Sequence, residues 1–227
     1  GIGFAVPSNM VRVVLASVRS GSTSFLRPWM GVDFQTVTSE ISESLGMSRP
    51  SGALVARVSD EGPAAAAGLI PGDVVLELDG KPVEHVNALG YRLATAGIGR
   101  EVELVVLSRN ERRTLQIAMA PAPEKTPRDA LVLENRSPFR GATIANLSPR
   151  VAMELDLPTS SRGVVVTAVG NGSTAQRLRI VPKDIILELN DEVVSDTRQL
   201  NNLTRQMFRS WRFTIERGGR RFTRTVR

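Results

Sequence analysis

Cysteine is absent from this chain of 227 residues, and histidine occurs once, at position 85. The lack of thiols excludes disulfides, cysteine nucleophiles and metal sites built on cysteine. A single imidazole excludes metal sites that need two histidines and leaves only His85 for acid–base chemistry. No serine stands in a Gly-x-Ser-x-Gly context beside it, so a surface histidine at a helix start is favoured. We therefore expect no cofactor, no metal and no catalytic residue within these 227 residues.

Long apolar runs are also missing, and none approaches the ~20 residues that a membrane-spanning helix needs. The chain begins at Gly1 and not at Met, so we expect an excerpt of a longer protein. The net charge of +6 is concentrated near the end, where eight arginines from Arg205 onward face the single acid Glu216. Such a segment can bind nucleic acid or another anion. Because no known binding module surrounds it, a solvated strand face is favoured and anion binding remains an alternative.

One stretch occurs twice. Residues 68–80 read GLIPGDVVLELDG, and residues 180–191 read IVPKDIILELND, which places Pro71 and Pro182 111 positions apart. Proline and glycine open a turn, an apolar run of strand length follows, and Asp-Gly closes a hairpin. The second copy has Lys183 in place of glycine. Two domains of about 100 residues each are therefore indicated, and each is large enough to bury its own core.

The elements of each copy follow the same order: strand, short helix, strand, helical turn, strand, hairpin, long helix, two strands. Residues 86–96 place Val86, Leu89 and Leu93 on one helix face that ends at Gly97. The proline-rich residues 120–128 form a linker. This order predicts a mainly β fold with short helices, built as two small, partly open β-barrels in tandem.

A partly open barrel has an edge strand, and an edge strand can accept an extended peptide as an additional strand. A glycine-containing loop at the start of that strand can direct several amides at a carboxylate. Residues 29–32, Trp-Met-Gly-Val, are the candidate loop, and the long helix forms the facing wall. Gly90 in that helix costs about 1 kcal/mol relative to alanine, and it either widens the groove or is a tolerated contact in the core.

Two motifs in this chain resemble those of a known protein family. The run GLIPGDVVLELDGKPV with its following helix resembles a PDZ domain of the bacterial HtrA/Deg (DegP-like) serine proteases. Residues 1–10, GIGFAVPSNM, resemble the last strand of that family's trypsin-like domain. The resemblance covers nearly the whole chain and implies this division: residues 1–25, the end of a protease domain; 26–120, a first PDZ domain; 121–130, a linker; 131–227, a second PDZ domain.

The resemblance also implies where peptides bind. It places the peptide-binding residues of the first domain at Trp29, Met30, Gly31, Val32, Val86, Leu89, Gly90 and Leu93. A second carboxylate-binding loop falls on Phe139, Arg140, Gly141 and Ala142. The sequence departs from the family at Pro28 and Trp29, where glycine and a smaller residue or tyrosine are more usual.

The function implied is a regulatory region of a periplasmic serine endopeptidase that acts in protein quality control. It would recruit chain ends or extended segments of unfolded proteins, contact its own protease domain and assemble in trimers. The Gly-Asn-Ser-Gly-Gly loop of the family's nucleophile is absent here, so the catalytic residues would precede Gly1. A scaffold without protease activity is the alternative, and nucleic-acid binding is not expected.

Overall fold

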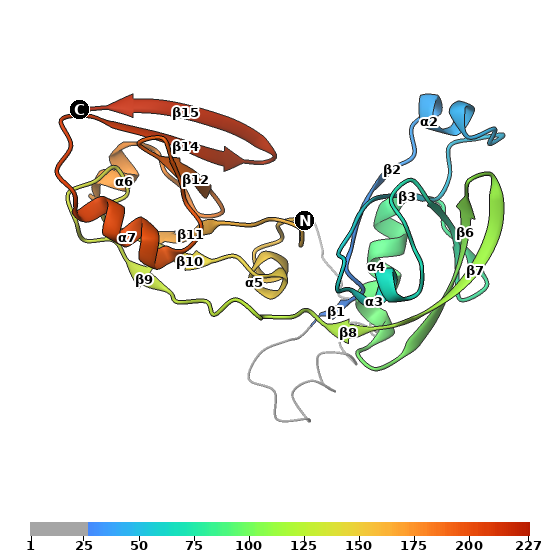
Figure 1. The fold of residues 1–227 in the computed structure, drawn as a ribbon. Coiled ribbons are helices and arrows are strands. Elements are labelled where there is room, and N and C mark those ends of the chain that lie inside the picture. Colours follow the sequence, from blue (N-terminus) through green and yellow to red (C-terminus); the bar gives the residue numbers. More distant parts are fainter. Residues whose placement is uncertain (1–26) are drawn as a thin grey trace, which may run out of the picture. The chain divides into compact units, whose positions relative to one another are not determined.

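The computed structural model describes residues 27–227, and these fall into two units that divide between Ala122 and Pro123 (Figure 1). The expected protease strand and linker helix at residues 1–25 lie outside the described residues. Each unit is mainly β-structure with short helices and an open sheet, and the two form tandem PDZ-like folds, as predicted.

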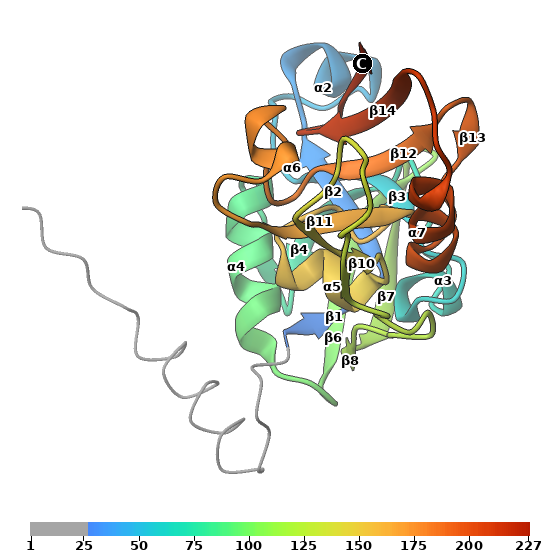
Figure 2. The ribbon, with the colours of Figure 1, turned by 90° about the vertical axis from the view of Figure 1, so that its left-hand side faces the viewer.

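The first unit is built on a sheet with the order β2-β3-β4-β6-β7, in which β5 pairs with β4 and the short strands β1 and β8 pair separately. Helix α4 runs along one side of this sheet (Figure 1, Figure 2). The bounds are β1 (Pro28–Trp29), β2 (Val32–Thr36), α2 (Ser39–Ser44), β3 (Ala53–Val58), α3 (Pro63–Ala66), β4 (Val74–Leu78), β5 (Lys81–Pro82), α4 (Val86–Ala96), β6 (Glu101–Ser108), β7 (Glu111–Ala118) and β8 (Ala120–Pro121).

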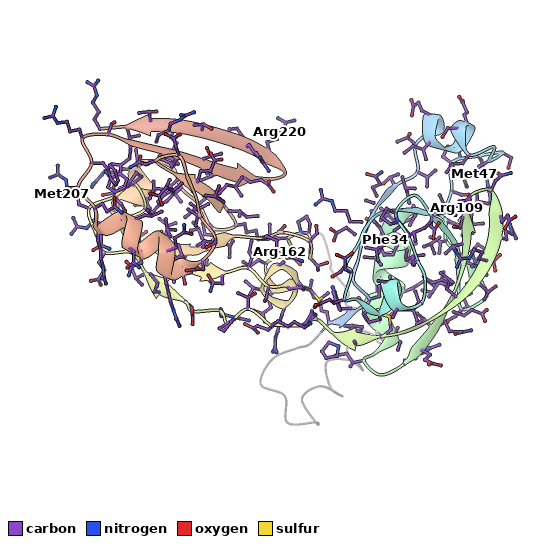
Figure 3. The ribbon with its side chains drawn as sticks, viewed as in Figure 1. Phe34, Met47, Arg109, Arg162, Met207 and Arg220 are labelled. Carbon is purple, nitrogen blue, oxygen red and sulfur yellow. The ribbon has the colours of Figure 1, made fainter. Side chains whose placement is uncertain are left out.

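The second unit repeats this plan with the order β15-β14-β12-β11-β10-β9, and β13 pairs with β12. The end of the chain forms the β14–β15 hairpin, and Arg220 lies at its turn (Figure 3). The bounds are β9 (Leu131–Val132), β10 (Ala142–Asn146), α5 (Pro149–Glu154), β11 (Val164–Val169), α6 (Thr174–Arg177), β12 (Ile185–Leu189), β13 (Glu192–Val193), α7 (Thr197–Arg205), β14 (Trp211–Arg217) and β15 (Arg220–Val226).

The repeated stretch folds alike in both units. A buried aspartate closes the turn before the central strand: Asp73 accepts the amide of Ile70 at 3.1 Å, and Asp184 accepts the amide of Val181 at 2.9 Å. Asp79 and Gly80 have φ angles of 49° and 68°, and Asn190 and Asp191 have 50° and 66°. Both pairs therefore form the left-handed hairpin turn that the sequence predicts.

Helices begin where capping side chains allow. The hydroxyl of Thr38 accepts the amide of Ile41 at the start of α2, and that of Ser148 accepts the amide of Val151 at the start of α5. His85 caps α4, since its Nδ1 accepts the amide of Ala88 at 3.2 Å. The single histidine is thus an exposed helix cap, as expected.

The proline-rich segment after Ala122 is part of the second unit. Arg128 pairs with Glu124 at 2.8 Å and with Glu154 of α5 at 2.9 Å. Arg150 extends this network with distances of 3.5 Å to Glu124 and 3.4 Å to Glu154. The segment is therefore held to the body of the second unit by ion pairs.

Candidate functional site

The first loop, Trp29–Val32, connects β1 to β2 and contains Gly31 at a φ of +84°. A Cβ on Gly31 would lie 3.0 Å from the Cα of Gly62 and 3.2 Å from the indole of Trp29. Both the backbone angle and the close approach of Gly62 require glycine at this position. The loop is therefore pressed tightly against the segment that precedes α3.

Two carbonyl groups of the first loop are anchored. The amide of Ala64 donates to the carbonyl of Met30 at 2.9 Å, and the amide of Ser59 donates to the carbonyl of Gly31 at 2.7 Å. Val32 stands opposite Val58 in the β2–β3 register. Because Ser59 bonds to Gly31, the residue before Val32, the pair Val32–Val58 is of the non-hydrogen-bonded kind. The amide of Val32 therefore points away from β3.

Three successive amides of the first loop remain unused. The Met30 and Gly31 amides have no acceptor among residues 27–227, and the Val32 amide faces the open side of β2. Successive backbone N–H groups in a bent loop form a cradle for an anion. A carboxylate is the anion that a polypeptide end supplies.

The strand that follows this loop is an edge strand. Within the described chain, β2 pairs with β3 on one side and has no strand on the other. Helix α4 packs against β1, β2 and β3. The edge of β2 and the helix are thus neighbours, which is the arrangement for strand addition against a helix wall.

The predicted helix residues divide into two groups. Leu89 and Leu93 are buried in the core, and Val86 packs against that core. Gly90 is exposed, and a Cβ placed on it would meet nothing within 4 Å. The leucines therefore form the base of the helix wall, and Gly90 leaves an open position on the helix surface.

Trp29 is part of the support for the first loop. Its side chain is only 5% exposed, and its indole edge lies beside Gly31. The indole nitrogen is buried without a hydrogen-bond partner in the described chain. The tryptophan that departs from the family pattern is therefore packed inside the domain.

The second loop, Phe139–Ala142, has the same backbone frame. Gly141 also has a φ of +84°, and a Cβ there would lie 2.4 Å from that of Ser173. The amide of Ala175 donates to the carbonyl of Arg140 at 3.1 Å, and the amide of Gly170 donates to the carbonyl of Gly141 at 2.8 Å. These bonds correspond to the two carbonyl anchors of the first loop.

The amides of the second loop, however, are bonded within the domain. Arg140 donates to the carbonyl of Ser137 at 3.2 Å, Gly141 to that of Leu133 at 2.7 Å, and Ala142 to that of Phe139 at 2.9 Å. Strand β9 also pairs with the outer edge of β10. A peptide site at this loop stays a prediction. A peptide could bind there only after residues 131–133 dissociate from β10 and from the loop.

Other chemistry has little support in the described residues. Residues 27–227 contain no cluster of three or more His, Asp or Glu side chains that could hold a metal ion. Among the same residues, no helix has the length and apolarity to cross a membrane. In the arginine-rich end, Arg217 binds Asp184, Arg212 binds Asp191, and Arg224 donates to the carbonyl of Leu178.

Comparison with known proteins supports the PDZ interpretation. The family model described as "PDZ domain" matches residues 28–119. A protein named "Probable periplasmic serine endoprotease DegP-like" from Pseudomonas fulva is 32% identical over 213 residues, which is 91% of this chain and 43% of that protein. A protein with the same name from Brucella suis is 31% identical over 202 residues, covering 88% of this chain and 38% of that protein.

A solved structure is also similar. "HtrA-type protease AlgW with decapeptide" shares 34% identity with a TM-score of 0.44, and the match covers 54% of this chain and 38% of that chain. This chain therefore spans less than half the length of the curated relatives described above.

Proposed function

Since this chain belongs to the HtrA/DegP family through its PDZ-containing region, we propose that its first domain captures the carboxyl end of an extended polypeptide. The observation that carries the proposal is the set of three unused amides at Met30, Gly31 and Val32, directly before an open strand edge. The amides take the carboxylate, and β2 takes the backbone.

The position of the first loop at the start of β2 supports one direction for the bound peptide. Its last residues lie antiparallel to β2, because the carboxylate must reach the loop at the start of that strand. The terminal side chain lies against the helix wall near Leu89 and Leu93. The open surface at Gly90 leaves room for a side chain further from the peptide end.

The second domain supports this direction from within the same chain. Residues 131–133 run antiparallel to β10, with Val132 opposite Thr143 and Leu131 opposite Ile144. The segment reaches the second loop at Leu133, whose carbonyl accepts the amide of Gly141. The chain's own segment thus takes the direction on β10 that we propose for a peptide on β2.

In the longer protein, this region recruits unfolded substrates for a periplasmic serine endopeptidase. The names of the relatives support the link to a periplasmic serine endoprotease, and the recruitment of unfolded substrates is our extension of the proposed peptide capture. The 227 residues contain no Gly-Asn-Ser-Gly-Gly loop, so we assign proteolysis to another part of the protein. Contact with that protease domain and assembly into trimers complete the proposal. Several first domains in one oligomer raise the avidity for a substrate with more than one binding segment.

The test is a titration of the chain with fluorescent decapeptides that end in valine or phenylalanine. Peptides with a free carboxylate should bind, and the same peptides with an amidated end should bind at least ~10-fold more weakly, a difference of about 1.4 kcal/mol. Equal binding of the free and amidated forms would rule out carboxylate capture.

A further inference from the structure

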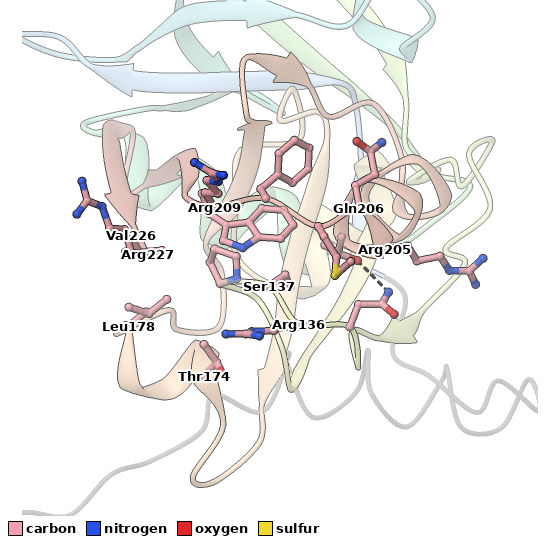
Figure 4. A pocket seen from close by; sticks show the side chains of 15 residues that line it. Arg136, Ser137, Thr174, Leu178, Arg205, Gln206, Arg209, Val226 and Arg227 are labelled. Atoms are coloured by element: carbon pink, nitrogen blue, oxygen red, sulfur yellow. Dashed lines mark hydrogen bonds between the residues drawn. The ribbon is translucent and has the colours of Figure 1, made fainter.

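The second domain contains a pocket of about 550 Å³ outside its second loop and its β10 edge (Figure 4). Its walls come from the segment before the second loop, from α6, from the end of α7 and the residues after it, and from the ends of β14 and β15. The pocket therefore lies entirely within one unit. Neither the fold nor the proposed peptide capture by the first domain uses it.

The charge of this pocket is one-sided. Arg136, Arg205, Arg209 and Arg227 line it, and no aspartate or glutamate does. Within the described chain, none of the four arginines has an ion pair or a hydrogen-bond partner for its guanidinium, in contrast to Arg217. Unpaired guanidinium groups around a concave surface attract carboxylates or phosphates.

Two of these arginines line different parts of the pocket. Figure 4 shows Arg209 toward the top of the pocket and Arg136 below it, whereas Arg205 points away to the opposite side from Leu178. Arg136 precedes the second loop and Arg209 follows α7, so residues far apart in the sequence supply this pair. Each of them can bind one negative charge of a ligand that spans the pocket.

Apolar and aromatic side chains form a second part of the lining. Phe208 and Trp211 pack edge to face, with ring centroids 4.9 Å apart. Phe208 is 39% exposed and Met207 is fully exposed, and Figure 3 shows Met207 projecting from the end of α7. Exposed aromatic and methionine side chains between arginines are typical of surfaces that bind a partner's apolar side chain.

Unused polar groups complete the pocket. Ser137 is 5% exposed, and its hydroxyl has no partner in the described chain. The exposed side-chain amide of Gln206 also has no partner among the described residues, whereas its backbone N–H donates to the carbonyl of Leu203. A peptide can bond to such groups with its backbone, whereas a hydrocarbon tail would cover them without replacing their hydrogen bonds to water.

We propose that this pocket binds an acidic polypeptide segment in which an aromatic side chain is flanked by carboxylates. The ring packs on Phe208 and Trp211, and the flanking carboxylates bind Arg136 and Arg209. This site needs no peptide end. Peptides that are blocked at both ends therefore separate it from carboxylate capture by the first domain.

The test uses the whole chain and a fluorescent heptapeptide, Gly-Asp-Glu-Phe-Asp-Glu-Gly, acetylated and amidated so that no terminal charge remains. We expect it to bind at least ~10-fold more tightly than Gly-Asn-Gln-Phe-Asn-Gln-Gly, which lacks the charges, or Gly-Asp-Glu-Ala-Asp-Glu-Gly, which lacks the ring. If either control peptide binds equally well, the proposal is wrong.

The matched variants are the double substitution Arg136→Gln/Arg209→Gln and the control Arg220→Gln. Arg220 is an exposed arginine of the same C-terminal segment, but it does not line the pocket. We expect the double variant to lose at least ~10-fold in affinity and the control to change less than about 2-fold. An unchanged double variant would overturn the proposal, as would a single-stranded oligonucleotide that binds the pocket more tightly than the acidic peptide.

Discussion

The amide of Gly141 donates a hydrogen bond of 2.7 Å to the carbonyl of Leu133, whereas the amide of the corresponding Gly31 has no acceptor among residues 27–227. Both glycines have a φ of +84°, and both loops are anchored through the carbonyls of the glycine and the residue before it. The two loops therefore have the same backbone conformation and the same carbonyl anchors. They differ because residues 131–133 of the chain occupy the second loop, whereas no described residue occupies the first. From this difference we assign peptide capture to the first domain.

The side chain of Leu133 should anchor the segment that closes the second loop. This side chain is fully buried in the second core, so Leu133→Ala should destabilise the second domain by about 3 kcal/mol. Val132 is the matched control, since it is 52% exposed at the preceding position and Val132→Ala should cost less than about 1 kcal/mol. Denaturant unfolding gives both values, and a smaller loss for Leu133→Ala than for Val132→Ala would contradict this account.

Several elements were predictable because local signals determine them. The Asp79-Gly80 pair predicts its hairpin, and the repeat places Asn190-Asp191 in the same turn although neither residue is glycine. Thr38 marks the start of α2 because its capping interaction is local. The order of elements was likewise readable from the turn residues and apolar patterns of both copies, and the family resemblance identified that order as PDZ-like.

Other features depend on contacts between distant residues. Residues 131–133 form a short apolar run after the linker, and no local signal shows that this run pairs with β10. Ser59 and Ala64 anchor the first loop through their amides, which any residue type except proline carries. The sequence therefore predicts which residues form the first loop. It does not predict which amides anchor that loop, or that residues 131–133 occupy the second loop.

Gly31 should tolerate no side chain. Gly31→Ala adds left-handed strain of about 1 kcal/mol and brings the new Cβ 3.0 Å from Gly62, so it should shift the loop and weaken peptide binding at least ~10-fold. Gly72→Ala is the control, because its φ of +95° carries similar strain but its Cβ would meet nothing within 4 Å. Fluorescence titration should show near-normal affinity for Gly72→Ala, and equal losses in both variants would contradict the role of the loop.

Arg217 should matter because it compensates a buried charge. Asp184 is fully buried, and its carboxylate lies 2.7 Å from one guanidinium nitrogen of Arg217. Arg217→Met leaves that carboxylate without its cation and should cost about 3 kcal/mol in thermal or denaturant unfolding. Adding Asp184→Asn should recover part of this loss, and a double variant less stable than Arg217→Met would argue against charge compensation.

Asp196 should make the stability of the second domain depend on pH. The pKa of its carboxyl is lowered mainly because the backbone amide of Gln199 donates to it at the start of α7. A lowered folded-state pKa stabilises the domain above the unfolded-state value of about 4, and this stabilisation disappears as the pH falls through the folded-state pKa. Asp196→Ala should therefore cost about 1 kcal/mol at pH 7 and less near pH 2.

The control for this pH dependence is Asp196→Asn, which keeps a capping oxygen but cannot titrate. The difference in unfolding free energy between Asp196→Asn and Asp196→Ala should stay constant with pH, whereas the difference between the natural chain and Asp196→Ala should shrink in acid. Comparing variants also cancels the contribution of Glu154, whose pKa is lowered chiefly by its hydrogen bond from Arg128. A natural chain that keeps its full advantage near pH 2 would exclude this role for Asp196.

The most direct measurement follows the backbone amides of both loops by NMR while a peptide with a free carboxyl end is added. The amide signals of Met30, Gly31 and Val32 should shift strongly, and those of Arg140, Gly141 and Ala142 should stay in place. Shifts confined to the second loop, or no shift at the first loop at saturating peptide, would contradict the claim that the first domain holds the open site.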